Sequence, residues 1–129
     1  MKLRLVWSVV IPALALAVVL GGCSGSGSKN NPEILFFYVE DCDHCARMRE
    51  ILNELLAKSP GVDVAFYEME SNQRLLWRLA QKHLLGTAFD VPVIFIGDRA
   101  IVGEGRAQEL ALRDAVQACA TSTCGSPLD

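Results

Sequence analysis

Two cysteines two residues apart, Cys42 and Cys45, lie between a short apolar run and a segment with helical periodicity. The run 34–39 has the length and composition of a strand buried on both faces, and 43–57 repeats its apolar residues at helical spacing. This order predicts Cys42 at or just before a helix start and Cys45 in the first turn. There the helix dipole favours a Cys42 thiolate, and the spacing lets the two sulfur atoms form a disulfide. Such a pair is suited to thiol–disulfide exchange.

The first 22 residues have the pattern of an export signal. Lys2 and Arg4 precede an almost wholly apolar stretch over 5–20, which is short for a membrane span. Leu20-Gly21-Gly22 then leads into Cys23, and this sequence resembles a bacterial lipobox. The resemblance implies cleavage before Cys23 and a diacylglycerol group on that cysteine. The alternatives are an uncleaved anchor and an ordinary signal followed by a coincidental cysteine.

We therefore expect a signal peptide (1–22), a lipidated flexible tether (23–32), one small folded domain (33–124) and a short tail (125–129). Alternating serine and glycine over 24–28 give the tether its flexibility. The expected location is the bacterial cell envelope, with the domain anchored to a membrane by lipid and facing the periplasm or the exterior. Inner and outer membrane are not distinguished.

The five cysteines fit this scheme, because a lipidated Cys23 leaves four in two local pairs. Cys42 and Cys45 form the first pair, and Cys119 and Cys124 the second, where the last helix should end. Export also provides an oxidising environment. For the second pair a structural disulfide, a second redox pair, and free thiols or a metal site all stay open.

Charge argues against nucleic acid as a partner. The chain has 12 basic and 15 acidic residues, and removing Lys2 and Arg4 leaves 10 against 15, a formal charge of −5. There is no basic run to contact phosphates. We expect a monomer.

The segments alternate in a way that predicts an α/β domain. Ser71 or Asn72 is positioned to cap the second helix, and Gly97-Asp98 is typical of a tight turn between two strands. The expected order β-α-β-α-β-β-α gives a four-stranded mixed sheet with helices on both faces. The expected ranges are strand 34–39, helix 43–57, strand 62–67, a helix from the cap at 71 or 72 to about 85, strand 91–96, strand 99–103 and helix 108–118.

This order resembles the thioredoxin-like family, in a compact, glutaredoxin-like form. The resemblance depends on the strand–CxxC–helix, on Val91-Pro92 leading a later strand, and on the hairpin before a last helix. It implies that Cys42 is the nucleophile and Cys45 a buried resolving thiol. It also implies that Pro92 is a cis-proline beside the pair and that Val91 offers backbone hydrogen bonds to an extended substrate. An ordinary trans proline at a strand start is the alternative.

The direction of exchange stays open. The pattern Cys-x-His-Cys resembles that of periplasmic dithiol oxidases. The resemblance implies that His44 stabilises the Cys42 thiolate and makes the disulfide oxidising. Asp43 and its acidic neighbours oppose a thiolate, and a solvated His44 without a role is the alternative. Phe36 occupies a position where thioredoxins commonly carry a buried acid that helps reduce substrates.

The resemblance implies a membrane-tethered thiol–disulfide oxidoreductase acting on exported proteins through a mixed disulfide at Cys42. Its partners would be exported protein thiols and disulfides and a membrane redox protein that resets it. No cofactor is expected beyond its own disulfide, and no resident metal. The alternative is a Cu(I)-binding or metal-delivery module that uses Cys42, His44 and Cys45 as soft ligands.

Overall fold

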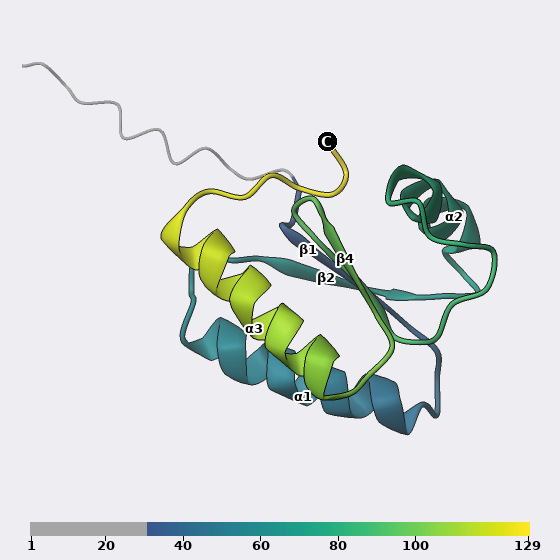
Figure 1. Cartoon of the computed structure of the whole chain (residues 1–129), viewed down its shortest axis with the longest axis horizontal. Coiled ribbons are helices and arrows are strands. Elements are labelled where there is room, and N and C mark those ends of the chain that lie inside the picture. Colours follow the sequence, from purple (N-terminus) through teal and green to yellow (C-terminus); the bar gives the residue numbers. More distant parts are fainter. Residues whose placement is uncertain (1–30) are drawn as a thin grey trace, which may run out of the picture.

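A computed structural model describes residues 31–129. The signal peptide, Cys23 and the tether up to residue 30 lie outside the described residues, so the expectations about them stay predictions. Between residues 31 and 129, no helix is both long enough and apolar enough to cross a membrane. The described elements are β1 (Ile34–Tyr38), α1 (Asp43–Ala57), β2 (Val64–Glu68), α2 (Gln73–Lys82), β3 (Val93–Ile96), β4 (Arg99–Val102) and α3 (Arg106–Thr121) (Figure 1).

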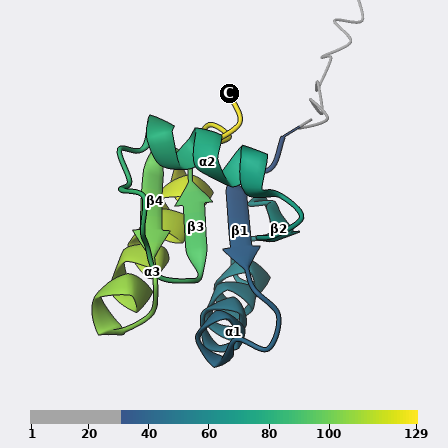
Figure 2. The same ribbon diagram turned by 90° about the vertical axis from the view of Figure 1, so that its right-hand side faces the viewer.

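The four strands form one mixed sheet in the order β2-β1-β3-β4 (Figure 2). β1 pairs with β2 in parallel and with β3 in antiparallel, and β3 pairs with β4 in antiparallel. A parallel pair needs a long crossover, which α1 supplies between β1 and β2. The element order and the mixed sheet confirm the predicted thioredoxin-like fold.

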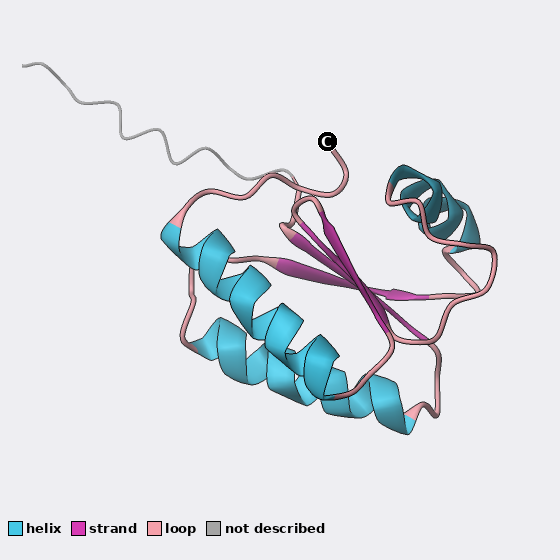
Figure 3. Ribbon diagram, viewed as in Figure 1, coloured by secondary structure: helices cyan, strands magenta, loops and turns pink. Residues whose placement is uncertain are grey.

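The helices form a layer on each side of the sheet (Figures 1 and 3). Successive side chains of β1 point to opposite faces, so its continuous apolar run serves two cores. On one face, α1 and α3 pack on a cluster that includes Ile34, Phe36, Cys45, Met48, Leu52, Ile94, Leu112 and Val116. On the other face, Leu76 and Leu79 of α2 pack on Leu35, Phe37, Val93 and Phe95.

The element ends differ from expectation where local hydrogen bonding decides them. Asn72 does precede α2, but its side chain donates to the Glu68 carbonyl at 2.8 Å instead of capping the helix. The same helix stops at Lys82, not at residue 85, because Leu84 adopts a left-handed φ of 55° and Leu85 N–H bonds back to the Ala80 carbonyl.

Residues 125–129, expected to form a tail beyond the domain, pack on it. Ser126 Oγ donates to the Pro32 carbonyl at 2.6 Å, and Lys82 Nζ donates to the Asp129 backbone oxygen at 2.6 Å. Leu128 packs against the core on the α2 side of the sheet. The C-terminus therefore joins the start of the domain to the end of α2.

Candidate active site

Cys42 and Cys45 are joined by a disulfide at the start of α1, with their Cα atoms 5.2 Å apart. Cys42 is the N-cap residue of α1, and its Sγ accepts a hydrogen bond from the Cys45 N–H at 3.1 Å. Cys45 is only 4% exposed, whereas Cys42 is half-buried. An incoming thiolate therefore has access to the Cys42 sulfur first, as the roles expected for the two residues require.

The turn between β1 and α1 positions this pair. β1 ends at Tyr38, and Asp41 has a left-handed φ of 55° just before Cys42. Aspartate tolerates this conformation better than most non-glycine residues, because its short side chain can bond locally. Phe36, at the position where thioredoxins commonly carry a buried acid, is fully buried in the same cluster as Cys45. The resolving sulfur therefore lies in an apolar environment.

Val91 and Pro92 lie at the same end of the sheet. The peptide bond between them is cis, as predicted. Val93 pairs with Phe37 near the end of β1, so Pro92 lies beside the segment that leads to the cysteines. Val91 and Cys42 pack against the same core cluster. Since Val91 makes no backbone hydrogen bond to any residue in 31–129, its N–H and C=O are available to an extended partner.

His44 faces the carboxylate of Glu104, a residue that no local pattern in the sequence links to it. Its Nδ1 contacts Glu104 Oε1, and the Arg47 Nε lies 3.7 Å from Glu104 Oε2. His44 is 61% exposed, whereas Glu104 is only 23% exposed. Among the described residues, Cys45 N–H is the hydrogen-bond donor to Cys42 Sγ, and His44 is not one. Stabilisation of a Cys42 thiolate by His44 stays a prediction, and it would act by charge and not through a hydrogen bond to the sulfur seen in residues 31–129.

A sequence signal for Glu104 did exist. It is the acidic residue between two glycines, Gly103 and Gly105, directly after the last strand. Both glycines have positive φ, 77° and 134°, which side chains rarely adopt. A charged residue between two such glycines indicates a loop shaped to aim one side chain.

Beside the disulfide, the β1–α1 turn and α1 form an open groove of about 810 Å³. The Arg49 guanidinium, which lies in it, is 4.4 Å from the Tyr38 ring centre and 4.6 Å from that of Phe66, within cation–π range. Carboxylates outnumber this one cation, and so the surface beside Cys42 is predominantly acidic. The acidic lining residues are Glu40, Asp41, Asp43, Glu50 and Glu54.

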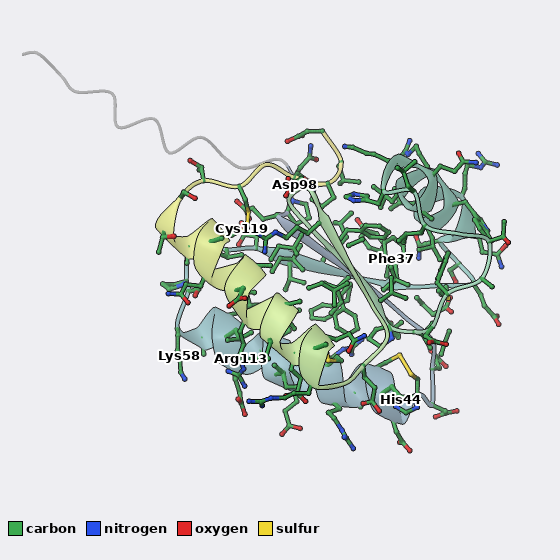
Figure 4. The ribbon with its side chains drawn as sticks, viewed as in Figure 1. Phe37, His44, Lys58, Asp98, Arg113 and Cys119 are labelled. Atoms are coloured by element: carbon green, nitrogen blue, oxygen red, sulfur yellow. A yellow bond between two sulfur atoms is a disulfide. The ribbon has the colours of Figure 1, made fainter. Side chains whose placement is uncertain are left out.

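The second cysteine pair is also a disulfide, but it lies at the other end of the sheet. Cys119 and Cys124 have Cα atoms 4.9 Å apart. Cys124 lies against Gly97, whose N–H donates to the Glu33 carbonyl just before β1. Cys42 follows the opposite end of β1, and the five residues of that strand span about 16 Å. Figure 4 shows Cys119 and His44 at these two ends of the molecule.

This separation limits what the two pairs can do together. They are too far apart to share one metal ion or to exchange a disulfide directly within the folded domain. Within residues 31–129 there is no group of three or more His, Cys, Asp and Glu side chains arranged to hold a metal ion. Cu(I) binding by Cys42, His44 and Cys45 would require reduction of the disulfide and release of His44 from Glu104.

No protein-family model matches the chain, and no curated protein matches it by sequence. Among solved structures it is similar to the glutaredoxin grx-1 from Archaeoglobus fulgidus, with 22% identity and a TM-score of 0.49, over 67% of this chain and 87% of that chain. It is also similar to the holo form of glutaredoxin C1 from Populus tremula x tremuloides, with 23% identity and a TM-score of 0.49, over 74% of this chain and 85% of that one.

Proposed function

We propose that this protein is a thiol–disulfide oxidoreductase that exchanges disulfides with exported proteins through Cys42 and Cys45. The observation that carries the proposal is the asymmetry of this disulfide at the start of α1, where Cys42 is half-buried and Cys45 is only 4% exposed. The free backbone groups of Val91 beside it support the same conclusion, because an extended chain can pair with them.

In the oxidising direction, a substrate thiolate attacks the Cys42 sulfur and forms a mixed disulfide. The bond to Cys45 breaks, and the Cys45 sulfur leaves with the electron pair and takes up a proton. A second substrate thiolate then attacks the substrate sulfur of the mixed disulfide. The substrate disulfide forms, and Cys42 leaves as a thiolate stabilised by the Cys45 N–H and the start of α1. Two electrons have passed to the protein, and reduction of a substrate is the reverse sequence.

We also propose that the protein works outside the cytoplasm of a bacterial cell, tethered by lipid on Cys23 and reset by a membrane redox protein. The signal pattern, the Leu-Gly-Gly-Cys sequence and the serine–glycine tether support this location. The second disulfide, Cys119–Cys124, fits an oxidising compartment. A Cys23→Ser change should move the protein from the membrane fraction to the soluble fraction, and unchanged fractionation would contradict lipidation.

Trapping of partner proteins tests the exchange activity. A Cys45→Ser variant cannot resolve the mixed disulfide, so Cys42 should accumulate covalent complexes with exported proteins. These complexes should disappear on adding reductant and in the matched Cys42→Ser/Cys45→Ser control. The proposed exchange with exported proteins is wrong if Cys45→Ser accumulates no more complexes than this control. Tight Cu(I) binding by the reduced protein, together with no exchange activity, would instead support a metal-binding role.

A further inference from the structure

Glu104 links the start of α1, which carries the cysteine pair, to the segment that contains Pro92. Its carboxylate reaches from the β4–α3 loop to His44 and Arg47 on α1. The residue before it, Gly103, donates its N–H to the Pro92 carbonyl at 2.8 Å. The residue whose side chain contacts the start of α1 therefore directly follows the residue that is hydrogen-bonded to Pro92.

The loop is built to hold Glu104 in this position. A Cβ atom at Gly103 would lie 3.3 Å from Asp90 Cβ, and one at Gly105 would lie 3.0 Å from Gln108 Oε1. Both glycines also have left-handed backbones, so a side chain at either position would be strained. Moreover, Glu104 Oε2 is buried, and the Arg47 guanidinium is the cation beside it. In this loop conformation the carboxylate contacts His44 and lies beside Arg47.

Glu104 contacts His44, which follows Cys42 by two residues, so its charge bears on the reduced form of the cysteine pair. Reduction by a dithiol transfers two electrons to the Cys42–Cys45 disulfide, the donor becomes a disulfide, and the protein is left with a Cys42 thiolate and a Cys45 thiol. A negative charge near Cys42 disfavours that thiolate, and a positive charge favours it. An ionised Glu104 limits the net charge of the His44–Glu104 pair to zero or less, whichever form the imidazole takes.

We propose that Glu104 is a positioning residue that holds His44 and offsets its positive charge, and so limits how oxidising the Cys42–Cys45 couple is. This inference rests on the proposed function and specifies how that same site is regulated. It explains why a Cys-x-His-Cys sequence need not give a strong oxidant. The His44 imidazole is held against a carboxylate and is not directed at the Cys42 sulfur.

The test is the equilibrium of the full-length protein in detergent with reduced and oxidised glutathione. In Glu104→Gln the pair has a net charge of zero or more, so the reduced form should gain about twofold to tenfold in the equilibrium constant. Thiolate absorbance of Cys42 should also appear at a lower pH. Glu109→Gln is the matched control, because it removes the same charge from a carboxylate that pairs with Arg106 on α3. It should give a clearly smaller shift.

A second variant tests the His44–Glu104 pair by removing the imidazole instead of the carboxylate. His44→Gln leaves Glu104 without the imidazole, so at about pH 5.5, where an ordinary imidazole is charged, the equilibrium should shift towards the disulfide. The double variant should return towards wild type. Opposite shifts from two substitutions of similar size cannot arise from a general loosening of the loop. Equal potentials in wild type, Glu104→Gln and His44→Gln would overturn the inference, and so would equal shifts in Glu104→Gln and Glu109→Gln.

This experiment separates failure of the inference from failure of the proposed function. If only the inference fails, the Cys45→Ser variant still traps partner proteins while the charge variants keep the wild-type potential. If the proposed function fails, no partners are trapped, although the glutathione equilibrium can still respond to Glu104.

Discussion

The backbone N–H of Cys45 donates to the sulfur of Cys42 at 3.1 Å, while the Cys45 side chain lies in the core. The N–H group that the Cys42 sulfur caps in the disulfide form is thus in place to donate to a Cys42 thiolate after reduction. The two cysteines consequently face different environments although they belong to one turn of helix.

Single-cysteine variants should reveal this difference. In Cys45→Ser, the remaining Cys42 thiol is accessible and lies at a helix start, which favours its thiolate. In Cys42→Ser, the remaining Cys45 thiol is buried among apolar side chains. We expect iodoacetamide to alkylate Cys42 at least about tenfold faster than Cys45 near neutral pH, as followed by mass spectrometry. Equal rates would contradict the assignment of nucleophile and resolving thiol.

The sequence allowed the fold to be predicted because its signals are local. The apolar run of β1, the periodicity of α1 and the proline before β3 each depend on neighbours along the chain. The Glu104 contact was missed because it joins His44 to a residue 60 positions away, and no local pattern encodes that pairing. The packing of the C-terminus was missed for the same reason, since Ser126 bonds to Pro32 across 94 positions.

The Cys119–Cys124 disulfide should stabilise the domain without tuning its redox site. Replacing both cysteines with serine opens a short loop, and chain entropy predicts a loss of about 2 kcal/mol in the free energy of unfolding. The potential of Cys42–Cys45 should not change, because the two pairs lie at opposite ends of β1. Urea unfolding and glutathione equilibration of the same variant measure the two quantities. A shifted potential with unchanged stability would instead indicate a second redox pair.

His83 should make the domain less stable in mild acid. Burial, and then the charge of Lys82, lower the pKa of His83, and Asp98 opposes this only in part. Because the folded-state pKa is the lower one, stability from neutral His83 is present above the unfolded pKa of about 6.5 and is lost as pH falls through the folded value. His83→Phe keeps a ring against Phe95 but cannot titrate.

The test measures the free energy of unfolding of wild type and of His83→Phe at about pH 7.5 and at about pH 5, on either side of the ordinary histidine pKa. Wild type should lose more stability over this range than His83→Phe. Equal losses in the two proteins would show that other groups cause the pH dependence.

Leu84 is a position where glycine should stabilise the protein. It is 93% exposed and has a left-handed φ of 55° just after α2. A non-glycine residue in that conformation costs about 1–2 kcal/mol, and an exposed side chain recovers little of it by burial. Leu84→Gly should therefore raise the free energy of unfolding by about 1 kcal/mol in urea titrations, after allowance for the greater freedom of glycine in the unfolded chain.

Leu110→Gly is the matched control, since Leu110 is 46% exposed inside α3. There the same substitution should lower stability by about 1 kcal/mol, because glycine disfavours a helix interior. Destabilisation by both substitutions would mean that Leu84 makes contacts that outweigh its backbone strain.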